Sequence, residues 1–402
     1  MTNPATSTIP SAPTRGRAAT VLLIAGFVLA AFNMRPALAG ISPLLGQIMA
    51  DTGLSPAGAG AITTVMVVCL GVLAPLAPLL SARVGLDRTL LAGLLILTSG
   101  VVLRSLDGLV GLYLGAAVAG TAIAIMNVIM PAAVKQHFPD RIGLLTSVYV
   151  TGLVVGAAAA SGLMVPLQQV TGYGWRVIAA SAAVPALAAA LLWLPQAVRA
   201  PARPSAPARR RLYHSLLRRP ITWHVTAYMG LQSFVFYATL AWLPTVFTDA
   251  GFPVDHAGYL LGLAQLVPVA ATLTVPVHAG RFRTQVPHIL ISSVLTIAGL
   301  AAVWLAPATM PWAWMIVLGL GQGASIALAL LIITLRAPDP ESVTALSAVA
   351  QGVGYVLAAA GPVLIGLLHE FSGGWGVPFA VLIGVCVAQT VFGWFAGRPS
   401  PR

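Results

Sequence analysis

Arg35 is the residue in this sequence whose type and position most clearly point to chemistry. It lies in the stretch FNMRPAL, inside an apolar run that extends from near Ala18 past Ile41. At 1.5 Å per residue, a helix from Ala18 to Arg35 is about 25 Å long, so the arginine lies midway in a long tilted membrane helix or towards its outer end. An arginine near the centre of such a helix costs about 2.5 to 3.5 kcal/mol on insertion scales and needs a partner or a wet cavity. We expect Arg35 to face a cavity as an anion site; a structural arginine that snorkels is the alternative.

The sequence offers Arg35 no acidic partner on its own helix. All nine Asp and Glu residues map to loops or to the ends of expected helices. The obvious counter-ion is a bound anion, because a planar guanidinium holds a small carboxylate-like, nitrite-like or cyanate-like anion through charge-assisted hydrogen bonds. The seven histidines also fall near helix ends or in loops, so a dedicated proton relay inside the membrane is not expected.

Further polar and aromatic side chains in apolar runs are candidates for the same site. Asn127 lies in the stretch AIMNVIM, where its amide needs partners and points either to a cavity or to another helix. Gln351 and Tyr355 share a helical face through their four-residue spacing. Aromatic side chains also fit a packed core or an interface belt, and Trp242 fits a belt or a gate. The candidate substrate-binding residues are Arg35, Asn127, Gln232, Phe236, Tyr237, Trp242, Gln351 and Tyr355.

The elements that carry these residues are membrane helices. Of the 402 residues, 58% are hydrophobic and 7% charged, and the mean hydropathy is +0.92, far outside the range of soluble domains. We expect an all-α protein with about twelve spans, since each apolar run is long enough to cross a hydrocarbon core of about 30 Å. The runs centre near Val28, Val68, Leu95, Ile123, Val154, Ala188, Phe234, Val267, Val294, Leu320, Ala358 and Val385.

The net charge of +12 is better explained by membrane topology than by nucleic-acid binding. Basic residues such as Arg88 and Lys135 follow every second run, on the side that holds the amino terminus, whereas only Arg104 and Arg176 fall on the opposite side. The positive-inside rule therefore predicts that both termini are cytoplasmic. The expected partners are a small-molecule substrate and the lipid bilayer, with no nucleic acid, and the chain is expected to be a monomer.

The chain contains an internal repeat of about 200 residues. Gly174-Trp175 recurs as Gly374-Trp375, Gly152 as Gly352, and Ser147 as Ser347. Six crossings return a chain to its starting side, so the two copies are parallel six-helix bundles, and the first helix aligns with the seventh. The expected domains are a cytoplasmic tail (1–17), an N-terminal bundle (18–197), a basic cytoplasmic linker (198–219), a C-terminal bundle (220–397) and a second tail (398–402).

Four motifs give the sequence a resemblance to a known family. They are Asn33-Met34-Arg35-Pro36, Met130-Pro131 leading to Lys135, Ala241-Trp242-Leu243-Pro244, and Gln351-Gly352-Val353-Gly354. With them the chain resembles the major facilitator superfamily, and within it the cyanate and 2-nitroimidazole transporter (CynX/NimT) branch. The resemblance implies a carrier in the bacterial inner membrane that works by alternating access, with substrate bound between the halves.

The sequence departs from the superfamily in one loop. The loop between the second and third helices carries Ala82 where the general pattern has an aspartate. The sequence therefore does not supply a carboxylate for gating at this position.

The expected function is secondary transport of a small anion, with Arg35 as the central binding group. The alternative is efflux of a neutral nitroaromatic or drug such as a 2-nitroimidazole, in which Phe236, Tyr237 and Trp242 dominate and Arg35 bonds a nitro group. An enzyme is not expected, because the sequence has no HExxH, no GxSxG and no clustered Cys/His ligands; no cofactor or metal is predicted. A channel fits the duplicated organisation less well than a carrier does.

Overall fold

The computed structural model describes residues 17–54, 56–200 and 215–399, and these fold into helices joined by short turns. Within these ranges, eleven helices are long and apolar enough to cross a membrane, and one bent helix pair raises the number to twelve if it is counted as one span. The expected all-α membrane architecture is therefore confirmed. The predicted tails and linker lie mostly outside the described residues, so the domain boundaries stay predictions.

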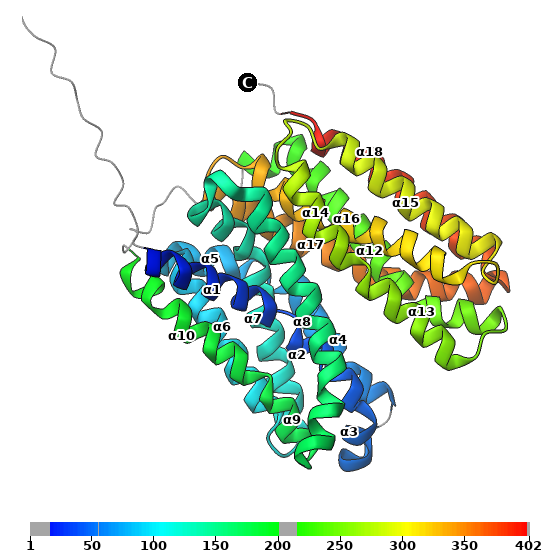
Figure 1. The fold of residues 1–402 in the computed structure, drawn as a ribbon, viewed down its shortest axis with the longest axis horizontal. Helices are drawn as coiled ribbons and strands as arrows, with labels where there is room; N and C mark the ends of the chain where they lie inside the picture. Colours follow the sequence, from blue (N-terminus) through cyan, green and yellow to red (C-terminus); the bar gives the residue numbers. More distant parts are fainter. Residues whose placement is uncertain (1–16, 55, 201–214, 400–402) are drawn as a thin grey trace, which may run out of the picture.

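The helices form two bundles that follow one another along the chain (Figure 1). The N-terminal bundle contains α1 (Arg17–Asn33), α2 (Pro36–Ala39), η1 (Ser42–Leu44), α3 (Leu45–Thr52), α4 (Pro56–Val72), α5 (Leu76–Val84), α6 (Leu86–Arg104), α7 (Leu109–His137), η2 (Pro139–Arg141), α8 (Ile142–Thr171), α9 (Trp175–Ser181) and α10 (Ala183–Arg199). The C-terminal bundle contains α12 (Pro220–Asp249), α13 (Val254–Leu266), α14 (Pro268–Ala279), α15 (Val286–Leu305), α16 (Pro311–Arg336), α17 (Pro340–Ser372) and α18 (Gly376–Gly397).

Several spans are interrupted near prolines, which lack the N–H that an uninterrupted helix needs. The first span breaks between α1 and α2, immediately before Pro36. The second consists of α4 and α5, which meet at an angle of 61° beside Pro75. The eighth passes from α13 to α14 at Pro268. The sequence predicted each of these spans as one apolar run, and the structure divides each into two helices.

Among the described residues, the two bundles pack most closely at one end. We call this the proximal end; it includes the beginning of α1 and the ends of α7, α16 and α18, and the opposite end is distal. One hydrophobic core runs through the N-terminal bundle into the proximal parts of α12, α16 and α17, including Met229, Leu331 and Leu346. The distal part of the C-terminal bundle has a separate core around Phe247 and Leu318. Figure 1 shows the bundles meeting near α14 and α17 and separating towards α3 and α9 on one side and α13 on the other.

Main-chain carbonyls accept most of the hydrogen bonds that cross the proximal contact. Lys135 donates to the carbonyls of Thr334, at 3.1 Å, and Ala337. Ser147 donates to the carbonyl of Thr272, at 2.7 Å. Gly143 lies so close to α14 that a Cβ there would be 2.4 Å from the carbonyl oxygen of Pro276. The proximal end is therefore closed by direct backbone approach.

The distal end of the N-terminal bundle carries its own ion pair. Asp51 of α3 accepts a hydrogen bond from Arg176 and one of 3.2 Å from the indole N–H of Trp175. These donors, Arg176 first, hold the pKa of the Asp51 carboxyl below its ordinary value. Since both partners are in the same bundle, the pair fixes α3 to α9 without linking the halves.

Candidate functional site

Arg35 lies at the break in the first span, between α1 and α2. Pro36 has no N–H, so the carbonyl of Phe32, four residues earlier, loses its helical donor. That carbonyl points at Gly156 of α8, where a Cβ would lie only 2.1 Å from the oxygen. The amide of Asn33 fixes the end of α1 by donating to the carbonyls of Leu29, at 2.7 Å, and Pro185, at 2.9 Å. The local sequence thus ends α1 and leaves Arg35 as the residue before α2.

The guanidinium of Arg35 meets tyrosine side chains from both bundles. Tyr237 of α12 and Tyr355 of α17 each interact with it through their hydroxyl groups, and Tyr149 of α8 is close enough for an electrostatic interaction. Tyr237 and Tyr355 are near the middle of their helices. Arg35 remains partly exposed in this setting, and it lies between side chains of both halves.

The charge of Arg35 has no acidic partner among the described residues. Its neighbours are phenols, which solvate a cation but do not neutralise it. The guanidinium therefore keeps its positive charge available at the centre of the molecule, where the low-dielectric surroundings strengthen attraction to an anion.

Asn127 and Gln351 form a polar contact across the halves, one helical turn along α17 from Tyr355. The amide nitrogen of Gln351 donates to the backbone carbonyl of Asn127, at 2.9 Å, and to the hydroxyl of Ser347, at 2.7 Å. The amide nitrogen of Asn127 and the amide oxygen of Gln351 have no hydrogen-bond partner, although both are buried. One free donor and one free acceptor therefore lie at the contact between the bundles.

Two other predicted residues on α12 are placed differently. Phe236 packs edge to face on Tyr237, with ring centroids 5.3 Å apart, so it borders the group around Arg35. Gln232 is buried and bonds within its own helix, to the carbonyl of Met229 at 3.2 Å and the hydroxyl of Ser233 at 2.6 Å. These contacts do not bring Gln232 to Arg35.

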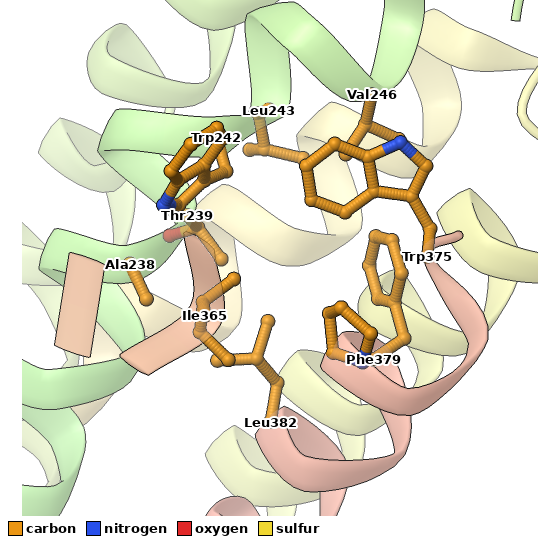
Figure 2. Close-up of a pocket in the computed structure, with 10 residues that line it drawn as sticks. Ala238, Thr239, Trp242, Leu243, Val246, Ile365, Trp375, Phe379 and Leu382 are labelled. Carbon is orange, nitrogen blue, oxygen red and sulfur yellow. The ribbon is translucent and has the colours of Figure 1, made fainter. Parts of the chain in front are cut away.

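Trp242 lines an apolar pocket inside the C-terminal bundle. Its indole N–H donates to the carbonyl of Pro362, at 2.8 Å, and its ring lies 5.9 Å from that of Trp375. Figure 2 shows Trp242 at the left of the pocket and Trp375 at the right, with Thr239 as the polar side chain in its lining. The lining comes from α12, α17 and α18, so Trp242 and Arg35 belong to different sites.

Two residues near Arg35 were missed by the sequence reasoning. Tyr149 is one of several aromatic residues in apolar runs, and no sequence signal separates it from core aromatics. Arg104 was counted as a loop cation, yet it is 1% exposed and donates to the carbonyl of Ala37. In a sequence, an arginine at the end of an apolar run occupies the same position whether its side chain extends into solvent or turns back into the bundle. The position of Arg104 therefore could not show that it is buried.

Comparison with known proteins identifies the family. The Major Facilitator Superfamily profile matches residues 21–359. The chain belongs to the major facilitator superfamily. It is 35% identical over 381 residues to the 2-nitroimidazole transporter of Escherichia coli, covering 94% of this chain and 96% of the relative. It is 29% identical over 359 residues to the cyanate transport protein CynX of the same organism, covering 88% and 91%. An uncharacterized transporter of Bacillus subtilis, YycB, is 36% identical over 378 residues, covering 94% and 93%.

Solved superfamily structures share the fold at low sequence identity. FucP in the outward conformation has a TM-score of 0.74 and 13% identity, covering 94% of this chain and 99% of that one. The proton:xylose symporter XylE has a TM-score of 0.73 and 14% identity, covering 95% and 96%. The superfamily fold, the resemblance to the cyanate and 2-nitroimidazole branch and the assignment as a secondary transporter rather than an enzyme are therefore confirmed.

In this major facilitator chain, the bundles are in contact at the proximal end and their ribbons separate towards the distal end (Figure 1). Lys135 and Gly143 belong to the closed contact, whereas Arg35 is partly exposed. A superfamily carrier exposes its substrate site to one side at a time. Arg35, Tyr237 and Tyr355, which were predicted from different helices, are the residues that the structure brings together.

Proposed function

We propose that the chain carries a small anion across the bacterial inner membrane by alternating access, with Arg35 as the central binding group. The observation that carries this proposal is a partly exposed guanidinium between the two bundles, with tyrosines around it and no carboxylate of the described residues paired to it. A cyanate-like, nitrite-like or small carboxylate anion supplies the missing charge. The name of the relative CynX, a cyanate transport protein, supports this substrate class.

The side chains around Arg35 suit a small planar anion. A guanidinium presents parallel N–H donors to the two oxygens of a nitrite-like or carboxylate anion, and single N–H donors to the end atom of a linear cyanate-like anion. The hydroxyls of Tyr237 and Tyr355 are positioned to add donors from the other bundle. On the proximal side, the free amide nitrogen of Asn127 is a further donor and the free amide oxygen of Gln351 an acceptor. Contacts from both halves let one ligand bias their relative arrangement.

The orientation follows from the basic residues at the proximal end. Arg88, Lys135 and Arg336 all lie at the proximal ends of their helices, so the positive-inside rule makes this end cytoplasmic. The structure then corresponds to an outward-facing carrier. Inward movement of one negative charge opposes about 2.3 kcal/mol per 100 mV of membrane potential, so uptake requires exchange or a co-transported cation, whereas efflux is electrically downhill.

Efflux of a neutral nitroaromatic is the second candidate function. The 35% identical relative named a 2-nitroimidazole transporter supports it. In this case the Phe236–Tyr237 pair provides an aromatic wall for the ring, and Arg35 donates hydrogen bonds to the nitro oxygens without a full charge on the ligand.

Thermal stabilisation by ligands tests the proposal and separates the two functions. Wild type, Arg35→Gln and a matched control, Arg176→Gln, are purified and heated with cyanate, nitrite, nitrate, acetate or 2-nitroimidazole. A ligand at 100 times its Kd contributes about 2.7 kcal/mol to the state that binds it, which is readily measured as a shift in Tm.

The anion proposal requires stabilisation of wild type and Arg176→Gln by an anion, and its loss in Arg35→Gln. Arg176 is the right control because it is a cation of the same bundle that pairs with Asp51 far from the halves' contact. Stabilisation by 2-nitroimidazole alone, unaffected by Arg35→Gln, would overturn the anion proposal and favour the aromatic wall.

A further inference from the structure

Arg104 is a second arginine inside the same bundle, buried where Arg35 is partly exposed, and the hydrogen bond that its guanidinium makes goes to the broken first span. It lies in the last turn of α6 and is 1% exposed. One terminal nitrogen donates to the carbonyl of Ala37, and the same nitrogen lies 3.9 Å from the sulfur of Met66. Its Nε has no hydrogen-bond partner. A cation in this position is expensive to bury, since no negative charge offsets its desolvation.

We propose that Arg104 is the positioning residue for Arg35: it holds α2 in place and thereby fixes the guanidinium that contacts substrate. The proposal rests on the function proposed above for Arg35. Arg104 itself is not placed against the tyrosines and is not assigned a contact with substrate.

The geometry of the break explains why α2 needs an external donor. The helix contains only one turn, Pro36–Ala39. Within the break, the N–H groups of Leu38 and Ala39 both donate to the carbonyl of Arg35, and that of Gly40 donates to the carbonyl of Pro36. The next carbonyl, that of Ala37, is the one that Arg104 binds. A single helical turn is unstable by itself because nucleation is costly, so the contact from α6 anchors the segment that begins beside Arg35.

The support behind Arg104 is rigid enough to serve as an anchor. Gly115 of α7 lies so close that a Cβ there would be 2.2 Å from the backbone nitrogen of Arg104. The same helix pair makes a second close approach, where a Cβ on Gly100 would be 2.5 Å from the backbone nitrogen of Ala119. Helices α6 and α7 are therefore in backbone contact at this end, and the side chain of Arg104 ties α2 to them. On its other side α2 packs on α8, where Ser161 donates to the carbonyl of Ala39 at 3.3 Å.

A double-mutant cycle distinguishes positioning from a general role in the fold. Cyanate and nitrite are used as probes, and Kd is measured for wild type, Arg35→Gln, Arg104→Met and the double variant. We expect Arg104→Met to weaken binding about tenfold in the wild-type background and less than twofold in the Arg35→Gln background, because contacts acting through one another are not additive. Equal losses in both backgrounds would overturn the proposal, even if Arg35 itself proves essential.

Hydrogen exchange provides a readout that needs no ligand. We expect the backbone amides between Asn33 and Ile41 to exchange faster in Arg104→Met, and in Arg104→Lys, which keeps the charge but not the planar donor, while the rest of α6 is unchanged. Met66→Leu is the matched control, since it removes the sulfur contact and leaves the bond to Ala37.

The two readouts separate the proposals. Unchanged exchange in a folded Arg104 variant overturns the positioning role. If Arg104→Met does not fold, Arg104→Lys decides by the same criterion. An Arg35→Gln variant that binds both anions as wild type does, together with faster exchange in the Arg104 variants, refutes the anion function and leaves the anchoring of α2 intact.

Discussion

Lys135 gives the clearest quantitative prediction about the balance between conformations. Its ammonium group, on the last turn of α7, donates to the carbonyls of Thr334 and Ala337 at the end of α16. These are carbonyls at a helix C-terminus, where a cation is favoured by the helix dipole. Because α7 and α16 belong to different bundles, the interaction exists only while the proximal end is closed.

The size of the effect follows from those contacts. A hydrogen bond to a charged group contributes about 1.5 to 3 kcal/mol, and partial exposure of Lys135 reduces that value through solvent screening. We therefore assign about 2 kcal/mol to the two bonds together. Lys135→Met keeps the apolar stem and removes the donors, so it should shift the equilibrium about 30-fold towards the state with an open proximal end.

Spin-label distances measure this shift directly. Labels at positions 141 and 281 replace two exposed arginines that flank the close approach of Gly143 to Gly280. Labels on the exposed Tyr173 and Tyr259 report on the distal ends. In Lys135→Met, the proximal distance should lengthen and the distal distance should shorten.

Arg88→Met is the matched control for this experiment. Arg88 donates to the carbonyls of Ala197, at 3.3 Å, and Ala200, at 3.1 Å, so it also binds the end of a helix, α10, but within its own bundle. Its loss should lower stability without changing either distance. Unchanged distances in Lys135→Met, or the same change in both variants, would refute the reasoning.

Two further predictions concern the site and the closed contact. Tyr355→Phe removes the hydroxyl beside Arg35 and should weaken anion binding about tenfold, as expected for one hydrogen bond to a charged group. Tyr228 is a buried tyrosine elsewhere in the C-terminal bundle, so the control Tyr228→Phe should change Tm but not the Kd for the anion. Equal changes of Kd in the two variants would contradict the assignment. Gly143→Val places a side chain against the Pro276 carbonyl and should open the proximal end in the same spin-label assay. Gly162→Val on the same helix faces open space, so a similar response there would show that steric contact is not the cause.

Much of the architecture could be predicted because helices that cross a membrane must be apolar along their length, and hydropathy detects such segments. The apolar runs marked the spans, and the recurrence of Gly174-Trp175 as Gly374-Trp375 marked the duplication. The breaks at Pro36 and Pro268 were harder to predict, since proline is also found inside membrane helices that continue without a break. Their effect depends on whether another helix accommodates the released carbonyl, as Gly156 does for Phe32.

The site was only partly predictable for a related physical reason. In a membrane bundle the lipid-facing and core-facing positions are both apolar, so periodicity does not show which way a side chain points. Charge without a partner singled out Arg35 as a candidate, and the structure brings the candidates Tyr237 and Tyr355 to it. Gln232 and Trp242 were equally plausible from sequence, but their bonds to Ser233 and Pro362 turn them elsewhere.

The predominance of main-chain acceptors at the proximal contact has a consequence for how this surface evolves. Lys135 and Gln351 bind the carbonyls of Ala337 and Asn127, and every residue type offers a carbonyl. The accepting positions can therefore change identity without loss of the bond, whereas the donors cannot. Deep mutational scanning should find Ala337 tolerant of small replacements and Lys135 intolerant, and pairwise covariation between the halves should be weak even though they touch.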